Sequence, residues 1–382
     1  MADDASSEAL CSIETKSTPF AVALSPDARA LAAGLVTGRV QCFAPLTGAL
    51  VGSFRPHRES VRELLWCTDA SSGSGASTSS SRLLTGSADA SLAMHDLARP
   101  SEALWRHEGA HGAPVSALAR LPGRSGKVVA SGDDDGAVRV WDLRCAPALK
   151  AAHAFKKHSD YISALSGGGS FDGGEHTLLA TSGDGTLSGF DLRKGKLEHR
   201  SDNQEDELLS LAVLKRGRKV VTGSTEGVLN IYSWGHLEDC SDRLPGHPES
   251  VSALVKVDED RLITASSDGL LRVVSIQPNR LVGVIGEHSD FPTERLDLHA
   301  GAKLLASASH DSVVKVWDVG HLYGGEGGEG GDDANEGDST DDEGQRRGKK
   351  RKKGGKASLA SSGRRHHNRQ RETAAFFSDI AD

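Results

Sequence analysis

A short segment recurs seven times in this chain of 382 residues, and this repetition limits the possible folds more than any other feature. Each copy has an apolar run, small residues around a turn, and an alternating β-branched run that often ends in an aromatic residue and an aspartate. The copies span residues 31–43, 83–97, 128–144, 178–193, 220–233, 262–275 and 304–319. Aligned on their turn positions, they lie 42 to 52 residues apart, which indicates one supersecondary unit per repeat.

Each repeat predicts two strands joined by a tight turn, because Asp-Gly pairs and small residues separate the two runs. A further strand precedes them, often after a histidine, as at His57, His111, His158 and His247. A fourth strand falls between repeats. Four short strands cannot bury their faces alone, whereas seven such sheets around one axis can. We therefore predict an all-β, seven-bladed propeller over residues 15–319.

The combination of His, Ser or Thr, turn Asp and Trp-Asp resembles the WD40 repeat family over about residues 15–319. The resemblance implies a hydrogen-bonded chain inside each blade, in which the turn Asp bonds the His and the Trp donates to the strand Ser or Thr. Two blades carry the full set, namely His111, Ser131, Asp135 and Trp141 in the third, and His288, Ser307, Asp311 and Trp317 in the seventh. The second, fifth and sixth repeats keep parts of it, and the first keeps almost none.

Segments outside the repeats complete the predicted organisation. Residues 1–14 contain a short apolar stretch that can add an outer strand to the last blade and close the ring, which removes a sheet edge. Residues 68–82, rich in Ser and Gly, are predicted to form a flexible loop. After residue 319 we predict a disordered charged C-terminal tail, made of an acidic Gly-rich linker (320–345), a basic segment (346–371) and a terminal segment (372–382).

Composition and motifs argue against several classes of protein. No run of 18 apolar residues occurs and the first ten residues lack an apolar core, so we expect a soluble intracellular protein with no membrane contact. The five cysteines are scattered without a C-x-x-C pair, which argues against disulfides and cysteine zinc sites. The motif G-x-G-x-x-G at Gly325–Gly330 precedes acidic chain and not a helix. We assign the repeat histidines to structural bonds and expect no catalysis, metal or cofactor.

The tail separates its charges into blocks, with nine acids and no base in residues 326–343, and twelve bases and no acid in residues 346–371. The densest basic run is Lys349, Lys350, Arg351, Lys352 and Lys353. Such runs bind nuclear import receptors or phosphate backbones. Because no aromatic residue interleaves with these bases, we expect any contact with RNA to be weak and electrostatic. We interpret the adjacent Phe376 and Phe377 as a docking motif, since they have no core to join.

One alternative function rests on the ends of two repeats. The sequences Trp141–Arg144 (WDLR) and Phe190–Arg193 (FDLR) resemble the W-D-x-R ending of WD40 proteins that act as substrate receptors of cullin-4 ubiquitin ligases. That resemblance implies Arg144 and Arg193 as contacts to the ligase adaptor. Arginine at this position is also common in ordinary propellers, so the alternative stays open.

The arrangement of the whole chain resembles a nucleolar subfamily of WD40 proteins, which is associated with the production or processing of ribosomal RNA. The resemblance implies a non-catalytic scaffold of the nucleus and nucleolus that acts in ribosome biogenesis. Its expected partners are ribosome assembly factors, an import receptor and, through the tail, pre-ribosomal RNA. We expect the protein itself to be a monomer.

Overall fold

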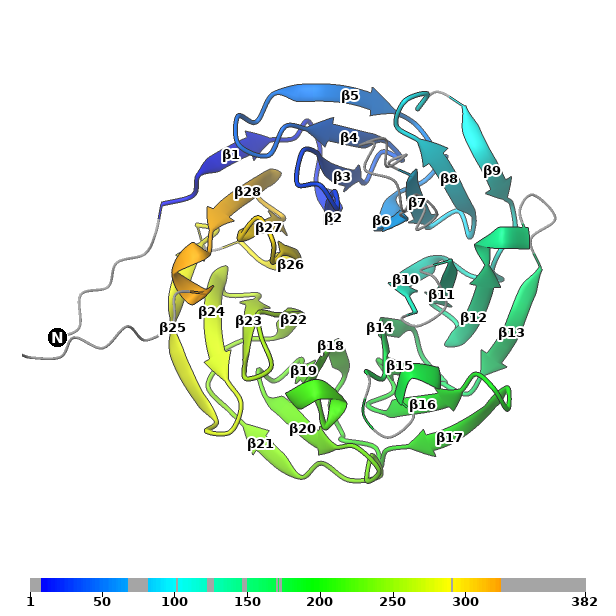
Figure 1. Cartoon of the computed structure of the whole chain (residues 1–382), viewed down its shortest axis with the longest axis vertical. Coiled ribbons are helices and arrows are strands. Elements are labelled where there is room, and N and C mark those ends of the chain that lie inside the picture. Colours follow the sequence, from blue (N-terminus) through cyan, green and yellow to red (C-terminus); the bar gives the residue numbers. More distant parts are fainter. Residues whose placement is uncertain are drawn as a thin grey trace, which may run out of the picture. The chain divides into compact units, whose positions relative to one another are not determined.

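The computed structural model describes residues 8–67, 82–100, 102–121, 127–145, 150–169, 171, 174–289 and 291–323. The chain divides into two units, residues 1–327 and 328–382, and all the described residues belong to the first. They form seven four-stranded antiparallel sheets arranged as a ring (Figure 1). The prediction of an all-β, seven-bladed propeller is confirmed.

Six blades consist of four consecutive strands, which run from the central channel outwards. Blade one contains β2 (Pro19–Leu24), β3 (Leu31–Leu35), β4 (Val40–Phe43) and β5 (Leu50–Phe54), and blade two contains β6 (Val61–Cys67), β7 (Arg82–Ser87), β8 (Leu92–Asp96) and β9 (Ala103–His107). Blade three contains β10 (Val115–Arg120), β11 (Val128–Asp133), β12 (Ala137–Asp142) and β13 (Ala151–Lys156), and blade four contains β14 (Ile162–Gly167), β15 (Thr177–Ser182), β16 (Leu187–Asp191) and β17 (Lys196–Arg200). Blade five contains β18 (Leu208–Leu214), β19 (Lys219–Ser224), β20 (Leu229–Ser233) and β21 (Asp242–Leu244), and blade six contains β22 (Val251–Lys256), β23 (Arg261–Ser266), β24 (Leu270–Ser275) and β25 (Arg280–Glu287).

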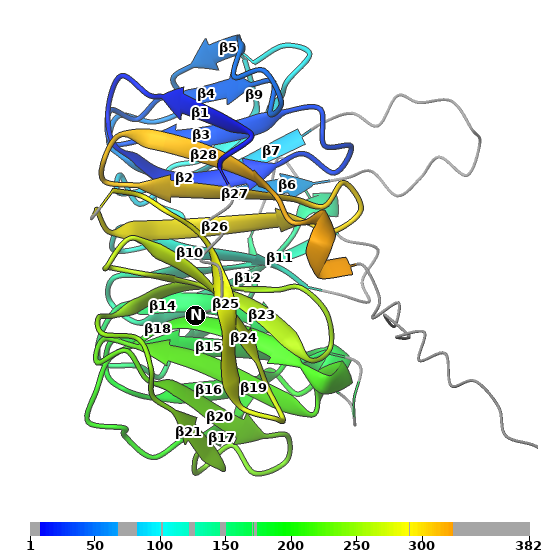
Figure 2. The same cartoon turned by 90° about the vertical axis from the view of Figure 1, so that its left-hand side faces the viewer.

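Blade seven joins the two ends of the described chain. Its inner three strands are β26 (Thr293–His299), β27 (Leu304–Ser309) and β28 (Val313–Asp318), and its outer strand is β1 (Cys11–Glu14). The register pairs Cys11 with Val316 and Glu14 with Val313 (Figure 2). The N-terminal stretch thus supplies the outer strand of the last blade, as the sequence predicts.

Tight turns between the second and third strands explain why Asp-Gly recurs in the repeats. In blade three the turn residue Gly136 has φ of +77°, a conformation that favours glycine. A Cβ there would lie 2.7 Å from the carbonyl oxygens of both His158 and Asp160, so the next blade also requires a glycine at this position. We call the face of the ring that carries these turns, such as residues 134–136 and 310–312, the turn face.

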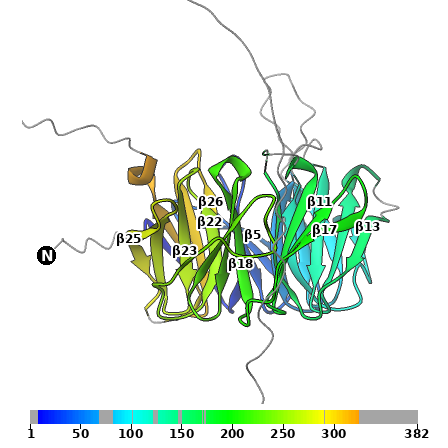
Figure 3. The same ribbon diagram turned by 90° about the horizontal axis from the view of Figure 1, so that it is seen from below.

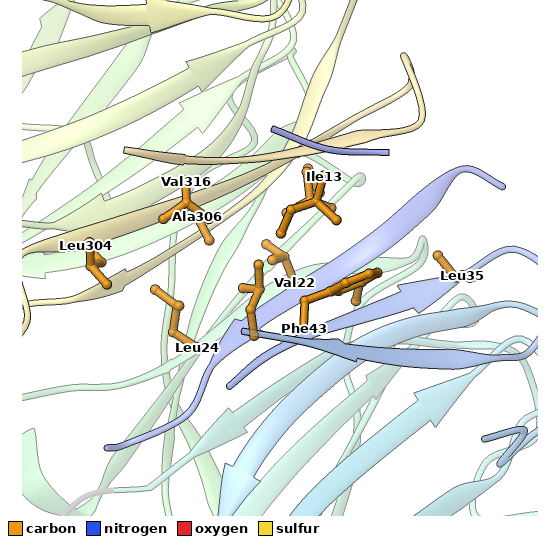
Figure 4. Packing of buried hydrophobic residues seen from close by; sticks show 12 residues of the cluster. Ile13, Val22, Leu24, Leu35, Phe43, Leu304, Ala306 and Val316 are labelled. Carbon is orange, nitrogen blue, oxygen red and sulfur yellow. The ribbon is translucent and has the colours of Figure 1, made fainter. Parts of the chain in front are cut away.

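The hydrophobic core is divided among the contacts between neighbouring blades. The cluster between blades seven and one combines Ile13 of β1 with Val22, Leu24 and Phe43 of blade one, and with Val316 of β28 (Figure 4). Burial of these side chains supplies the main driving force for closing the ring. Second strands such as β3, β11, β15 and β27 are therefore buried at every position, because each of their faces packs against a neighbouring blade.

The described residues include four short 3-10 helices, which lie in connections at the face opposite the turn face, and the strands run between the two faces (Figure 3). They are η1 (Leu143–Cys145), η2 (Gly174–His176), η3 (Lys215–Gly217) and η4 (Gly320–Tyr323). The ordered ring extends past the predicted boundary at residue 319, because Leu322 of η4 is buried in a core cluster. No helix in the described part of the chain is long and apolar enough to cross a membrane.

Candidate protein-interaction site

Blade seven contains the complete hydrogen-bonded chain that its sequence implies. Trp317 Nε1 donates to Ser307 Oγ at 2.9 Å, and Ser307 Oγ lies 2.7 Å from Nε2 of His288. The other ring nitrogen of His288, Nδ1, lies 2.9 Å from Oδ2 of Asp311. Burial lowers the pKa of His288, although the Asp311 carboxylate opposes this shift. A neutral imidazole accepts from the serine and donates to the aspartate, so all three polar groups are satisfied inside the blade.

Blade three has the same chain, but the predicted aspartate is wrong. His111 Nδ1 lies 2.8 Å from Oδ2 of Asp133, while Asp135 is exposed and contributes only a backbone N–H, which donates to Asp133 Oδ1. Ser131 Oγ links His111 to Trp141 as expected, and Trp141 Nε1 donates to it at 2.7 Å. The cause is a run of three aspartates at the turn. Asp133 ends β11 inside the blade and reaches the histidine first, which leaves Asp135 at the turn in solvent.

The remaining blades keep parts of the chain. In blade two, His57 bonds Thr85 at 2.7 Å and Asp89 at 3.2 Å. In blade four, His158 Nδ1 bonds Asp184 at 3.2 Å. In blade six, His247 bonds Thr264 at 2.9 Å, but Asp268 pairs with Arg272. Each of these histidines is buried in its own blade, and no group of three or more metal-binding side chains occurs among the described residues.

A ring of bulged residues opens onto the central channel at the turn face. In every blade the pairing between the inner and second strand shifts by one residue near its start, which is the mark of a β-bulge. The seven bulged residues are Phe20, Arg62, Ser116, Ser163, Leu209, Ser252 and Glu294. All seven line one cavity of about 550 Å³, which we call the channel mouth.

Pairs between different elements hold the charged groups of the channel mouth. Arg62 Nη1 of blade two lies 2.6 Å from Asp134 Oδ2 of blade three. His310 lies 3.4 Å from Glu294. The Tyr161 hydroxyl donates to Oε2 of Glu207 at 2.8 Å, and burial together with this carboxylate raises the pKa of Tyr161. Glu207 is thus held by a phenol and not by a cation. The mouth offers fixed polar groups beside aromatic and aliphatic surface, which is typical of a binding site.

Sequence comparison places this geometry in a known family. A family profile described as WDR55 matches residues 11–322. WD repeat-containing protein 55 of Arabidopsis thaliana is 37% identical over 317 residues, which cover 82% of this chain and 84% of that protein. WD repeat-containing protein JIP5 of Cryptococcus neoformans is 34% identical over 327 residues, which cover 81% of each protein. The chain belongs to the WD repeat-containing protein 55 family.

Members of this family are WD40 propellers, a class that generally works through protein–protein contacts without catalysis. The channel mouth of this member was not predicted from the sequence. The signal that could have located it is the second residue of each inner strand, which follows a buried apolar residue such as Val61, Val115 or Val251. Those second positions differ in chemistry from blade to blade, as expected for residues that face a ligand and not the core.

The two arginines of the alternative hypothesis lie in neighbouring blades, each after its third strand. Arg144 Nε donates to Asp142 Oδ1 at 2.8 Å, and Arg193 Nη2 lies 3.7 Å from Asp191 Oδ2. Their side chains are 62% and 58% exposed. Both are therefore accessible to a partner, although each already pairs with the aspartate of its own repeat.

The sites predicted in the tail lie outside the described residues. They are Lys349, Lys350, Arg351, Lys352, Lys353, Phe376 and Phe377. Most of the predicted loop at 68–82 lies outside them as well, since only Arg82 is described, as the first residue of β7. For this member of the family, import, RNA contact and docking through the tail stay predictions.

Proposed function

We propose that this protein is a non-catalytic scaffold of the nucleus and nucleolus that acts in the production or processing of ribosomal RNA. One observation carries the proposal. The histidines and aspartates that could support chemistry are bonded inside individual blades, whereas the turn face presents an open cavity with mixed polar and apolar surface. A rigid ring of this kind binds several partners without carrying out a reaction on them.

The tail supplies the localisation in this proposal. Its basic run, Lys349–Lys353, has the composition that import receptors bind, and it also attracts phosphate backbones. A contact with pre-ribosomal RNA through this run is electrostatic and weakens as salt is added. Ribosome assembly factors then meet the propeller at high local concentration, because the tail tethers it near them.

Fluorescence microscopy of the full-length protein tests this proposal against deletion of residues 346–356. The full chain is expected in the nucleolus, and the deletion variant is expected to lose that enrichment. A full-length protein that stays diffuse in the cytoplasm contradicts the proposal. Proximity labelling with both proteins then identifies the partners, and we expect ribosome assembly factors whose recovery falls when the tail is shortened.

A second candidate function is that of a substrate receptor for a cullin-4 ubiquitin ligase. It is favoured by the exposure of Arg144 and Arg193, which follow aspartates in neighbouring blades. In this case proximity labelling recovers cullin components in place of assembly factors.

A further inference from the structure

A second hollow lies next to the channel mouth, between blades four and five. This hollow has a volume of about 360 Å³ and is formed by the connections that precede β14 and β18 and by the turn that follows β15. Glu207 lines both cavities, so they meet at one side chain. Tyr161 lies beside this junction and donates to the Glu207 carboxylate. A segment bound across the junction therefore touches both cavities.

The second hollow is lined by carboxylates without basic residues. Its acidic lining residues are Asp160, Asp184, Glu205, Asp206 and Glu207, and its described lining contains no Lys or Arg. Burial opposes ionisation of Asp184, but hydrogen bonds from the Thr186 hydroxyl and the Ser159 backbone lower its pKa overall.

Internal cations balance little of this charge. Among the described residues, two basic side chains lie near these carboxylates, and both are at Asp184: His158 at 3.2 Å, whose pKa burial lowers, and Arg200 at 3.4 Å. Asp206 accepts from the backbone N–H of Glu226, and Glu207 accepts from a phenol. Neither bond brings a positive charge. The electrostatic potential in the hollow is therefore negative, and it attracts cationic groups of a partner.

The bulged residues on this side of the channel mouth are uncharged, unlike the lining of the hollow. Ser163 and Leu209 are the bulged residues of blades four and five, and neither carries a charge. The half-buried Tyr161 also lines the mouth there. An extended chain that places basic residues in the hollow thus has apolar surface for a neighbouring side chain at the channel mouth.

We propose that the two neighbouring cavities bind an extended basic segment of a partner protein, in which lysines or arginines flank an apolar residue. The carboxylates of the hollow bind the basic side chains, while Tyr161 and Leu209 contact the apolar one. A nucleic acid does not fit this surface, because its phosphates meet carboxylates. This inference rests on the proposed scaffold function and names the chemistry of one partner.

Fluorescence anisotropy with the purified full-length protein tests the proposal. The probe is a labelled peptide of sequence KRLKRLK, and a GSLGSLG peptide serves as the uncharged comparison. The test variant combines Glu205→Gln, Asp206→Asn and Glu207→Gln, which keep the acceptor oxygens for Glu226 and Tyr161. The control variant combines Glu102→Gln, Glu238→Gln and Asp239→Asn, which change the net charge equally at exposed positions on other connections. Thermal unfolding verifies that both variants are folded.

The wild-type protein and the control variant are expected to bind the basic probe with equal affinity and the uncharged peptide hardly at all. The test variant is expected to bind about tenfold more weakly, because it lacks three charges that each contribute a modest attraction. Equal binding by test and control variants overturns the proposal, as does a wild-type protein that fails to bind the probe. Probe binding that appears only after Lys349–Lys353 are changed to Gln also overturns it, since the chain's own basic run then occupies the groove.

The scaffold proposal is tested independently in cells. Nucleolar enrichment of the wild-type protein does not depend on the groove, so it remains if only the groove assignment is wrong. If the wild-type protein is cytoplasmic but still binds the probe, the scaffold proposal is wrong and the groove assignment stands.

Discussion

Single buried hydrogen bonds at the residue scale hold the turn of a blade against the loop before its inner strand. In blade three one carboxylate serves several donors, because Asp133 accepts from His111 and from the backbone N–H groups of Asp135 and Ala137. In blade seven Asp311 bonds His288 and the backbone N–H of Val313. Both blades thus bond the histidine to an aspartate, but this aspartate stands at a different position relative to the turn in each blade.

Substitution of the two candidate aspartates in blade three distinguishes their roles. Asp133→Ala leaves buried donors without acceptors and is expected to lower the free energy of unfolding by about 2 kcal/mol. Asp135→Ala removes the same charge from an exposed position and is expected to change that free energy by less than about 0.5 kcal/mol. Urea denaturation monitored by tryptophan fluorescence measures both. A larger loss for Asp135→Ala contradicts the assignment of Asp133.

At the scale of the element, β1 is the strand on which closure of the ring depends. It pairs only with β28 and places Ile13, which is 4% exposed, in the cluster between blades seven and one. A four-residue strand has few hydrogen bonds, so the buried isoleucine must supply much of its attachment.

Truncation of this side chain tests the attachment. Ile13→Ala is expected to lower the free energy of unfolding by about 2 kcal/mol and to speed hydrogen exchange in β28. Ser12→Ala, at the exposed neighbouring position, is the control and is expected to change neither. Hydrogen exchange read by mass spectrometry follows the amides of Val314 and Val316. Unchanged exchange there in Ile13→Ala means that β1 does not hold blade seven closed.

The inner strand β26 carries an acid whose proton affinity changes on folding. Asp297 accepts from the backbone N–H of Leu24 at 2.6 Å and of Leu298 at 3.0 Å. Burial nevertheless raises its pKa from 3.8 to about 6. The folded protein therefore holds this proton more tightly than the unfolded chain. The stabilisation from protonation is complete below pH 3.8 and is lost as the pH rises through about 6.

Asp297→Asn removes this dependence on pH. The free energy of unfolding of the variant minus that of the wild type is expected to be larger at about pH 7.5 than at about pH 4.5, by about 2 kcal/mol. Urea denaturation of both proteins at the two pH values measures this difference, and the other titrating groups cancel. A difference that stays constant, or that grows as the pH falls, contradicts a raised pKa.

At the scale of the whole molecule, the sequence predicts the ring because its repeats are local. Each Asp-Gly turn and each alternating strand can be recognised from neighbouring residues alone. The same holds for the apolar stretch before Glu14. The choice between Asp133 and Asp135 depended on which carboxylate reaches His111 in space, and alignment on the turn acid chose wrongly. The bulged residues were also missed, since a bulge is a property of two paired strands. Arg295 and Glu63 pair at 3.1 Å although 232 positions separate them, and no pattern of neighbouring residues predicts this ion pair.

The alternative ligase function is also a property of the whole molecule, because an adaptor would have to contact two blades together. Arg144 and Arg193 follow the third strands of blades three and four, so both lie at the face opposite the turn face. The proposed basic-segment groove lies on the turn face. A receptor that used both arginines would thus keep the channel mouth free, and the two hypotheses differ in the face that is occupied.

The combined variant Arg144→Ala and Arg193→Ala is expected to leave the melting temperature nearly unchanged, because solvent screens both ion pairs. Asp191 still accepts from the backbone N–H groups of Arg193 and Lys194. A scaffold predicts unchanged recovery of ribosome assembly factors by this variant, whereas a ligase receptor predicts loss of the cullin-4 adaptor from pull-downs. Lys150→Ala with Lys196→Ala removes two exposed cations near the same blades and is the matched control. Undiminished adaptor recovery by the arginine variant eliminates the motif-based ligase hypothesis.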